Sequence, residues 1–207
     1  YDTTDLVVVV PIGNAGNITA VMEGFVDLYR LEIIPQLPRI IGVQSQHANP
    51  VARWWREGRY QPIKVKPSVA QAAMIGDPVS FPKVSQLVSA YFQDRFSVVE
   101  VTEQEIIDQM LEANRHGHIV CTQGGESIAG VKKAVEQGLI KKTDKVVVDS
   151  TSHQLKFSGF QQMYFEDRLP KEYEIMPRKE LQNRPIQLPA SASQIAQYLN
   201  LQRKSCA

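Results

Sequence analysis

A loop rich in glycine and asparagine is the first part of the sequence whose residue types could do chemistry. It consists of Gly13, Asn14, Ala15, Gly16 and Asn17. A run of valines at 7–10 precedes it and is typical of a strand buried on both faces, and a helical stripe of apolar residues begins at Ile18 directly after it. This order of strand, loop and helix points several backbone N–H groups and the positive end of a helix dipole at one place. We therefore predict a site for a phosphate-sized anion at residues 13–17.

The loop by itself leaves a second interpretation open. Glycine and asparagine are also the residues of a tight turn that binds nothing. The loop matches neither the G-x-G-x-x-G pattern of dinucleotide-binding folds nor the G-x-x-x-x-G-K-[ST] pattern of nucleotide hydrolases. A ligand site and a purely structural turn are both compatible with these five residues.

A second polar segment, Ser150 to His153, follows another valine-rich run at 145–149. Taken alone, Thr151 would be interpreted as a helix N-cap and His153 as an ordinary surface histidine. A third segment, the glycine pair at 124–125, opens a further helical pattern. What these segments do depends on the elements that position them.

Strands and helices alternate along the chain, which predicts an α/β fold of three α/β/α layers with a mostly parallel sheet. In such sheets ligands bind beyond the carboxyl ends of the strands, where the loop at 13–17 and the segment 150–153 both fall. We expect strands at residues 7–10, 39–44, 97–101, 118–121 and 145–149. We expect helices at residues 18–29, 48–57, 68–75, 80–92 and 124–137. The helix at 48–57 is expected to have Asn49 as its N-cap, and a further helix is expected to follow the capping box at 102–105.

The end of the chain predicts a tail. We expect the α/β domain at residues 1–165 and the tail at 166–207, because charges and prolines replace the periodic pattern there. A final helix is expected at 190–201, N-capped near Ser191 or Ser193, and the tail is expected to pack on the domain.

The composition narrows the class of protein. The chain has 207 residues, 43% of them hydrophobic, and a formal net charge of +1. These values predict one domain with a core and argue against a nucleic-acid or membrane partner. The histidines share no metal-ligand spacing with Cys121 and Cys206, so we expect no zinc and a cytoplasmic protein with free thiols. Because the chain opens on Tyr1 and reaches its first strand at once, we expect a piece of a longer protein.

Four blocks of sequence resemble the carboxyl-terminal half of threonine synthase, a pyridoxal-phosphate enzyme of the tryptophan synthase β-like fold, or fold type II. They are VPIGNAGNITA at 10–20, PSVAQAAMIGDPVSF at 67–81, IVCTQGGESIAGVKK at 119–133 and VVVDSTSHQLKF at 146–157. The resemblance implies pyridoxal 5′-phosphate as cofactor, with its phosphate on the backbone amides of residues 13–17. It also implies that Thr151 of a T-x-H motif, completed by His153, meets the pyridine nitrogen.

The resemblance further implies a lyase of threonine biosynthesis that converts O-phospho-L-homoserine and water to L-threonine and phosphate. In that family the Schiff-base lysine lies upstream of the glycine loop, so we expect this chain alone to be inactive and to need the N-terminal remainder of the same enzyme. A homodimer is compatible with the resemblance. No lysine of this chain is expected to bind the cofactor covalently; Lys156 follows the T-x-H block but is not the family's lysine. Ser152 and Gln154 depart from the pattern, because many relatives have glycine at both positions.

Two other functions stay open. The chain could belong to another fold type II enzyme, such as a threonine dehydratase or a cysteine synthase, although the block at 67–81 disfavours this. It could also be a non-catalytic module that binds a phosphate-bearing ligand. A lysine-bearing domain encoded directly before Tyr1 would favour an enzyme.

Overall fold

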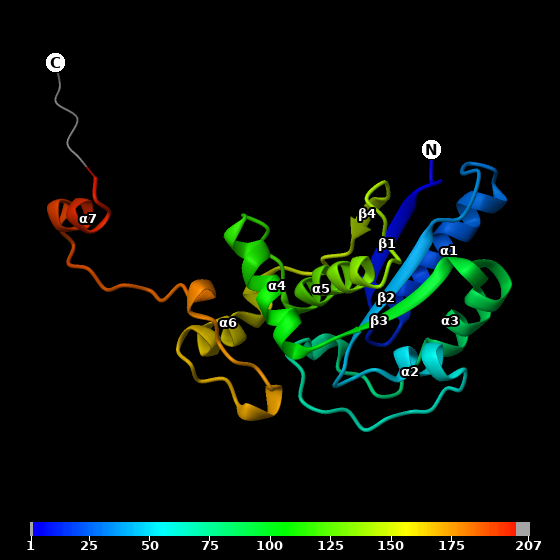
Figure 1. The fold of residues 1–207 in the computed structure, drawn as a ribbon, viewed down its shortest axis with the longest axis horizontal. Coiled ribbons are helices and arrows are strands. Elements are labelled where there is room, and N and C mark those ends of the chain that lie inside the picture. The colour runs from blue at the N-terminus through cyan, green and yellow to red at the C-terminus, as the bar shows by residue number, and fades with distance from the viewer. Residues whose placement is uncertain (1, 202–207) are drawn as a thin grey trace, which may run out of the picture.

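Four strands form the centre of the fold in the order β3-β2-β1-β4, and every neighbouring pair is parallel (Figure 1). The structure is a computed structural model and describes residues 2–201, so Cys206 lies outside the described residues. The predicted α/β fold with a parallel sheet is confirmed. The strands are β1 (Leu6–Pro11), β2 (Arg39–Ser45), β3 (Phe96–Val101) and β4 (Lys145–Val148).

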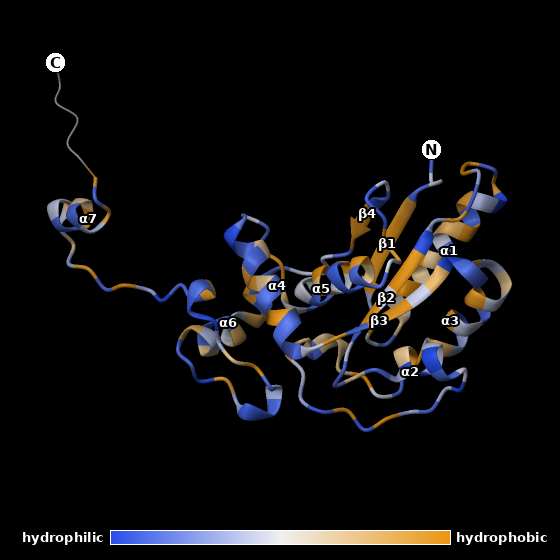
Figure 2. Ribbon diagram, viewed as in Figure 1, coloured by the Kyte–Doolittle hydropathy of each residue, from blue (hydrophilic) through white to orange (hydrophobic). Residues whose placement is uncertain are grey.

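Helices cover both faces of this sheet and create two separate cores. Alternate residues of a strand point to opposite faces, so Val8 and Val10 of β1 pack with one group of helices and Val7 and Val9 with the other. Figure 2 shows β1 as almost continuously hydrophobic, as expected for a strand covered on both sides. The first core contains α1 (Gly16–Arg30), α2 (Pro50–Glu57) and α3 (Phe81–Leu87), which continues as a π-helical turn at Val88–Phe92. The second contains α4 (Glu103–Arg115), α5 (Thr122–Glu136) and α6 (Ser158–Phe165).

Two predicted elements are wrong. The helix expected at 68–75 is only a 3₁₀ turn at Gln71–Ala73 (η1). The strand expected at 118–121 is a single antiparallel bridge between Val120 and His153. Because α5 already begins at Thr122, the chain there has no room to run along the sheet, and the glycine pair lies inside the first turn of α5 rather than before it.

The glycine pair allows α5 to approach its neighbours closely. A Cβ on Gly125 would lie 2.6 Å from the carbonyl oxygen of Ile106 in α4, and a Cβ on Gly124 would lie 2.9 Å from the carbonyl oxygen of Ser150. Both glycines therefore serve the packing of α5 against α4 and against the segment that follows β4.

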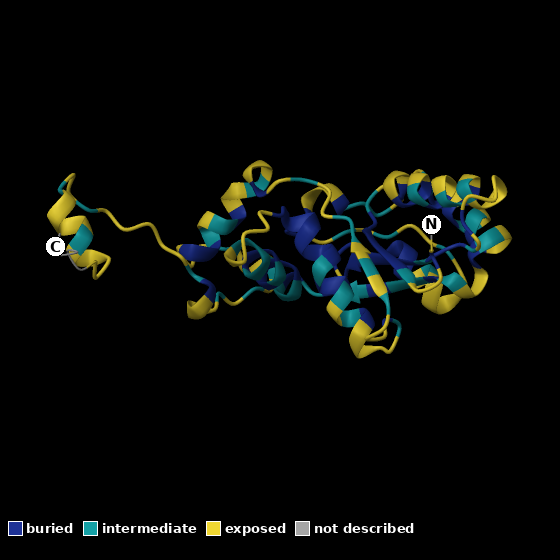
Figure 3. Cartoon of the chain, turned by 90° about the horizontal axis from the view of Figure 1, so that it is seen from above, coloured by how far each residue is buried: buried dark blue, intermediate teal, exposed yellow. Residues whose placement is uncertain are grey.

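The tail divides into a packed part and an exposed part. Its first part contains 3₁₀ turns at Lys171–Tyr173 and Lys179–Leu181, and Tyr173, Ile175 and Leu181 pack against the second core. The final helix α7 (Ala192–Tyr198) begins after Ser191 as expected, but it has no buried residue and lies apart from the sheet (Figures 1 and 3). Within the described residues, the tail thus packs against the second core as far as Leu181, whereas α7 has no buried residue. None of the helices in residues 2–201 combines the length and the apolar composition that a membrane crossing requires.

Candidate functional site

A cavity of about 400 Å³ lies at the carboxyl end of β1. Segments that are distant in the sequence form its walls: Pro11, residues 13–17, Ala72, Ala73, Gln123, Thr151, Ser152, Lys156 and Phe157. All six residues that we predicted to hold the cofactor, residues 13–17 and Thr151, are in this set. The structure therefore brings the two predicted segments to one place.

The glycine loop turns the chain sharply from β1 into α1. Ile12 still donates a backbone hydrogen bond to the carbonyl oxygen of Val43 (2.8 Å), and Ala15 then adopts a left-handed conformation with φ 63° directly before the helix. Thr19 closes the first turn, because its N–H and its hydroxyl both donate to the carbonyl oxygen of Ala15 (3.1 and 2.6 Å).

The N–H groups of residues 13–17 are free hydrogen-bond donors. Within residues 2–201, no acceptor takes a hydrogen bond from any of the five. Gly16 and Asn17 begin α1, where N–H groups have no acceptor inside the helix. Five free donors and the positive end of the α1 dipole thus lie on the wall of a cavity that no carboxylate lines, an arrangement that fits a phosphate group.

The loop is supported by the segment that follows α2. A Cβ on Gly13 would lie 2.8 Å from the carbonyl oxygen of Ala72, so only glycine allows this close approach. Ser80 donates its N–H to the carbonyl oxygen of Asn14 (3.1 Å). With its amide oxygen turned toward them, Gln123 of α5 accepts from the N–H groups of Gln71 and Ala72 (3.2 and 2.9 Å). The segment around η1 is therefore held by its neighbours instead of by a helix of its own.

Thr151 reaches the cavity in an unusual backbone conformation. Its φ is 51°, in the left-handed region that β-branched residues rarely adopt. Asp149 stabilises this turn, because one of its carboxylate oxygens accepts a hydrogen bond from the Thr151 N–H (2.9 Å). Its other oxygen accepts a hydrogen bond from the side-chain amide of Asn17. Asp149 thus connects the glycine loop with the T-x-H segment, a role that the sequence analysis missed.

Cys121 and His153 lie beside Thr151 in different ways. The buried, free thiol of Cys121 is 3.4 Å from the Thr151 hydroxyl and accepts a hydrogen bond from the N–H of Gly124 (3.4 Å), which caps α5. His153 is exposed and does not line the cavity; its Nδ1 accepts the N–H of Leu155 (3.2 Å). Of the T-x-H motif, only Thr151 and Ser152 line the cavity.

Lys156 and Phe157 also line the cavity, which sequence reasoning did not foresee. The sequence analysis assigned Lys156 no place in the site. The signal that could have placed it is its distance of five residues from Thr151, because a short turn after the strand returns the chain to the same edge of the sheet.

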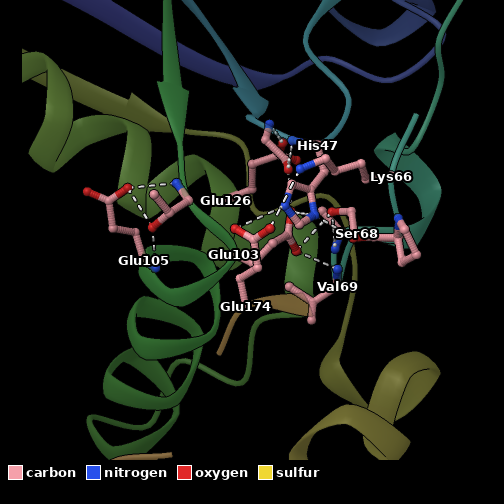
Figure 4. Close-up of polar contacts among 12 residues, drawn as sticks. His47, Lys66, Ser68, Val69, Glu103, Glu105, Glu126 and Glu174 are labelled. Carbon is pink, nitrogen blue, oxygen red and sulfur yellow. Dashed lines mark hydrogen bonds and ion pairs between the residues drawn. The ribbon is translucent and has the colours of Figure 1, made fainter. Parts of the chain in front are cut away.

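A buried polar cluster holds residues 67–69, the start of the segment that leads to Ala72 and Ala73 on the cavity wall (Figure 4). Glu103, at the start of α4, accepts hydrogen bonds from the N–H of Val69 (2.6 Å), the hydroxyl of Ser68 (3.1 Å) and the hydroxyl of Ser45. Its carboxylate also lies 3.7 Å from Nδ1 of His47. Burial raises the pKa of Glu103, and these hydrogen bonds and His47 oppose that rise.

Glu126 of α5 is the second carboxyl of this cluster and is fully buried. One of its oxygens accepts the N–H of Ser45 (2.8 Å), and the other has no hydrogen-bond partner. Burial, and then the negative charge of Glu103, raise the pKa of Glu126 well above its ordinary value. Burial and the nearness of the two carboxyl groups therefore both disfavour a charge on Glu126. Within the described part of the chain, no group of three or more His, Cys, Asp or Glu residues is arranged to hold a metal ion.

Comparisons with known proteins agree with this geometry. The chain is 36% identical over 152 residues to the threonine synthase of Methanocaldococcus jannaschii, and 34% identical over 154 residues to threonine synthase 2, chloroplastic, of Arabidopsis thaliana. These alignments cover 72% and 73% of this chain but only 37% and 29% of the two relatives, so the chain spans about a third of their length.

Solved structures agree on the fold. The threonine synthase of Escherichia coli superposes on 96% of this chain and 44% of its own with a TM-score of 0.59 at 20% identity. The threonine deaminase isoform 2 of Solanum lycopersicum has the same TM-score and identity and covers 77% of this chain and 43% of its own. These likenesses confirm the fold type II architecture and do not distinguish between activities.

The family model described as pyridoxal-phosphate dependent enzyme matches residues 2–151, which include the glycine loop, Ala72, Ala73 and Thr151. The match covers well over half of the chain, with three of the four blocks that carry the resemblance in full and the fourth as far as Thr151. The chain belongs to the family of pyridoxal-phosphate dependent enzymes.

Proposed function

We propose that this chain is the cofactor-phosphate-binding part of a threonine synthase, which converts O-phospho-L-homoserine and water to L-threonine and phosphate. Support comes from the curated relatives, because those at 32–36% identity all carry the name threonine synthase. Since the chain spans about a third of their length, the proposed reaction belongs to a longer protein.

The observation that carries the proposal is the set of five free N–H groups at residues 13–17 on the cavity wall. A phosphate that binds there accepts hydrogen bonds from the backbone and meets the positive end of α1. Gly13, Asn14, Ala15, Gly16 and Asn17 are thus the proposed phosphate ligands. The close contact between Gly13 and Ala72 keeps this loop in place, because a side chain there would force the two segments apart.

Thr151 is the proposed partner of the ring nitrogen. Pyridoxal phosphate, when bound, supplies an electron sink that stabilises negative charge on the substrate. A hydroxyl exchanges a hydrogen bond with the ring nitrogen but brings no negative charge to stabilise a protonated ring. Thr151 therefore makes the sink milder than a carboxylate would. Asp149 and Cys121 orient Thr151 through its N–H and its hydroxyl.

We place the lysine that bonds the cofactor outside residues 1–207, and we propose that this chain alone is inactive. The support is the family resemblance, in which that lysine precedes the glycine loop. The N-terminal remainder of the enzyme and the substrate O-phosphohomoserine are the corresponding partners.

The test is a substrate panel for the full-length protein that carries this sequence. We expect equal amounts of L-threonine and phosphate from O-phospho-L-homoserine, and no keto acid from L-serine or L-threonine. Keto acid and ammonia from the unphosphorylated amino acids would instead identify a dehydratase. Phosphate binding without turnover of any of the three would identify a binding module.

A further inference from the structure

Lys156 is the one charged side chain among the residues that line the cavity. The lysine ion pairs found within residues 2–201 involve Lys66, Lys83, Lys133 and Lys145, and none involves Lys156. The side chain is exposed, so its ammonium group can reach a ligand that enters from solvent.

The backbone around Lys156 is fixed by the T-x-H segment. Lys156 lies in the 3₁₀ turn Gln154–Phe157 (η4), and its N–H donates to the carbonyl oxygen of His153 (3.2 Å). His153 also accepts the N–H of Leu155 through Nδ1 (3.2 Å). The turn is therefore held to His153 by two hydrogen bonds, and Lys156 lies with Thr151 and Ser152 on the cavity wall.

Among the described residues, Lys156 has no counter-ion in the cavity. No carboxylate of residues 2–201 lines it, and the two oxygens of Asp149 already accept hydrogen bonds from Asn17 and Thr151. The glycine loop has five free donors of its own, which suffice for one phosphate group without any lysine. The cavity therefore offers positive charge for a second anionic group.

We propose that Lys156 binds the phosphate of a phosphomonoester substrate and so selects phosphorylated amino acids over unphosphorylated ones. This inference rests on the proposed function, because it assigns the loop to the cofactor and leaves Lys156 for the substrate. Lysine suits this task, since a compact ammonium on a flexible stem can bind a phosphate and then let it leave. Lys156 makes no covalent bond in this role.

The experiment compares Lys156→Ala, Lys156→Arg and Lys142→Ala in the full-length protein that carries this sequence. Lys142 is an exposed lysine that does not line the cavity, so its variant is the matched control. Three quantities are measured: the amount of pyridoxal phosphate retained, and the dissociation constants of O-phospho-L-homoserine and of L-homoserine from spectral titration.

We expect Lys156→Ala to weaken O-phospho-L-homoserine binding about tenfold, as for loss of one charged hydrogen bond, and to leave L-homoserine binding and cofactor content unchanged. Lys156→Arg should restore most of the affinity, and Lys142→Ala should behave as wild type. Loss of cofactor from Lys156→Ala would overturn the inference, because Lys156 would then hold the cofactor's own phosphate. Equal affinities for the phosphorylated ligand in wild type and Lys156→Ala would overturn it too.

These titrations, together with the assay of threonine formation from O-phospho-L-homoserine in the substrate panel, separate this inference from the proposed function. A wild-type protein that forms no threonine but shows the tenfold effect on phosphomonoester binding contradicts the proposed function and supports Lys156. A protein that forms threonine without any effect of Lys156→Ala supports the proposed function and contradicts Lys156.

Discussion

Single residues at this site are positioned by their neighbours more than by their own preferences. Thr151 has a φ of 51°, which costs a β-branched residue on the order of 1–3 kcal/mol. Its N–H is bound by Asp149, and its hydroxyl lies 3.4 Å from the thiol of Cys121. The hydroxyl is thus presented to the cavity by a turn that other residues hold in place.

Removal of this hydroxyl should affect activity more than cofactor retention. In the full-length protein, Thr151→Ala should lose the proposed hydrogen bond to the ring, worth about 1 kcal/mol, or about fivefold in cofactor affinity, while the glycine loop, in its proposed role, keeps the phosphate. We expect activity to fall by more than this factor, as measured by threonine formation and by cofactor absorbance after dialysis. Thr151→Ser is the control that keeps the hydroxyl. Complete loss of cofactor from Thr151→Ala would contradict the assigned role.

The buried carboxyl of Glu126 should make stability depend on pH. Its pKa is raised in the folded protein by burial and by Glu103, with Cys121 adding a smaller effect; His47 faces Glu103 on its other side. An acid with a raised pKa binds its proton more tightly when folded. Its contribution to stability is therefore complete below the ordinary pKa near 4.5 and is lost as the pH rises toward the folded value.

We expect Glu126→Gln to remove this loss of stability at rising pH, because the glutamine amide has nearly the same shape as the carboxyl group but does not ionise. Urea unfolding from pH 4 to pH 8 should show a wild-type slope that is steeper by up to about 1.4 kcal/mol per pH unit than that of the variant. Parallel curves over this range would mean that Glu126 is charged in the folded protein.

At the scale of elements, the sequence predicts those that follow from local pattern and misses those that depend on distant partners. The capping box is confirmed, because Thr102 and Glu105 bind each other's backbone within four residues. Asn49 does occupy the cap position of α2, but its side chain makes no cap hydrogen bond. Instead Gln44 of β2 accepts the N–H groups of Val51 and Ala52 (2.9 and 3.0 Å). No pattern within the helix reveals a cap that comes from a neighbouring strand.

The difference between local pattern and distant partners also explains which residues of the candidate site could be predicted. Residues 13–17 and Thr151 were predictable, because each follows a recognisable strand and ligands bind at strand ends. The segment 68–75, which places Ala72 and Ala73 on the cavity wall, is predicted as a helix, because nothing in the sequence shows that Glu103 and Gln123 would bind its N–H groups. Asp149 and Lys156 were missed as site residues, because their roles depend on the turn that follows β4.

Two glycine substitutions in one region should separate loop geometry from helix propensity. Gly13→Ala places a Cβ 2.8 Å from a backbone oxygen, so we expect a loss of about 1–3 kcal/mol in unfolding free energy and weaker binding of inorganic phosphate. Gly24 lies in α1, the helix that follows the loop, and a Cβ on it would have nothing within 4 Å. Gly24→Ala should therefore stabilise the protein by about 0.5–1 kcal/mol. Urea unfolding and phosphate titration measure both. Unchanged stability in Gly13→Ala would show that η1 yields easily.

At the scale of the whole molecule, one sheet with two cores supports the cavity at its carboxyl edge. The two cores meet along β1, because its alternate valines belong to different clusters. The second core extends into the tail as far as Leu181, whereas α7 contributes no buried residue (Figure 3). The part of the tail up to Leu181 should therefore contribute more to the stability of the fold than α7 does.

Two leucines of the tail make this difference measurable. Leu181 is 8% exposed, so Leu181→Ala should cost about 2–5 kcal/mol of unfolding free energy. Leu199 is 55% exposed and follows α7, so Leu199→Ala should change stability by less than about 0.5 kcal/mol. Comparable losses in urea unfolding would mean that α7 docks on the domain or on a second copy.

The left-handed conformation of Thr151 also has a consequence for how this position can vary. Glycine and asparagine adopt that conformation more readily, so mutation filtered only for folding would drift away from threonine. Threonine or serine would persist at this position only where the function of the hydroxyl benefits the organism more than the lower stability of the protein harms it. A library of all twenty residues at 151 should therefore give opposite rankings when it is selected for stability and when it is selected for growth without threonine.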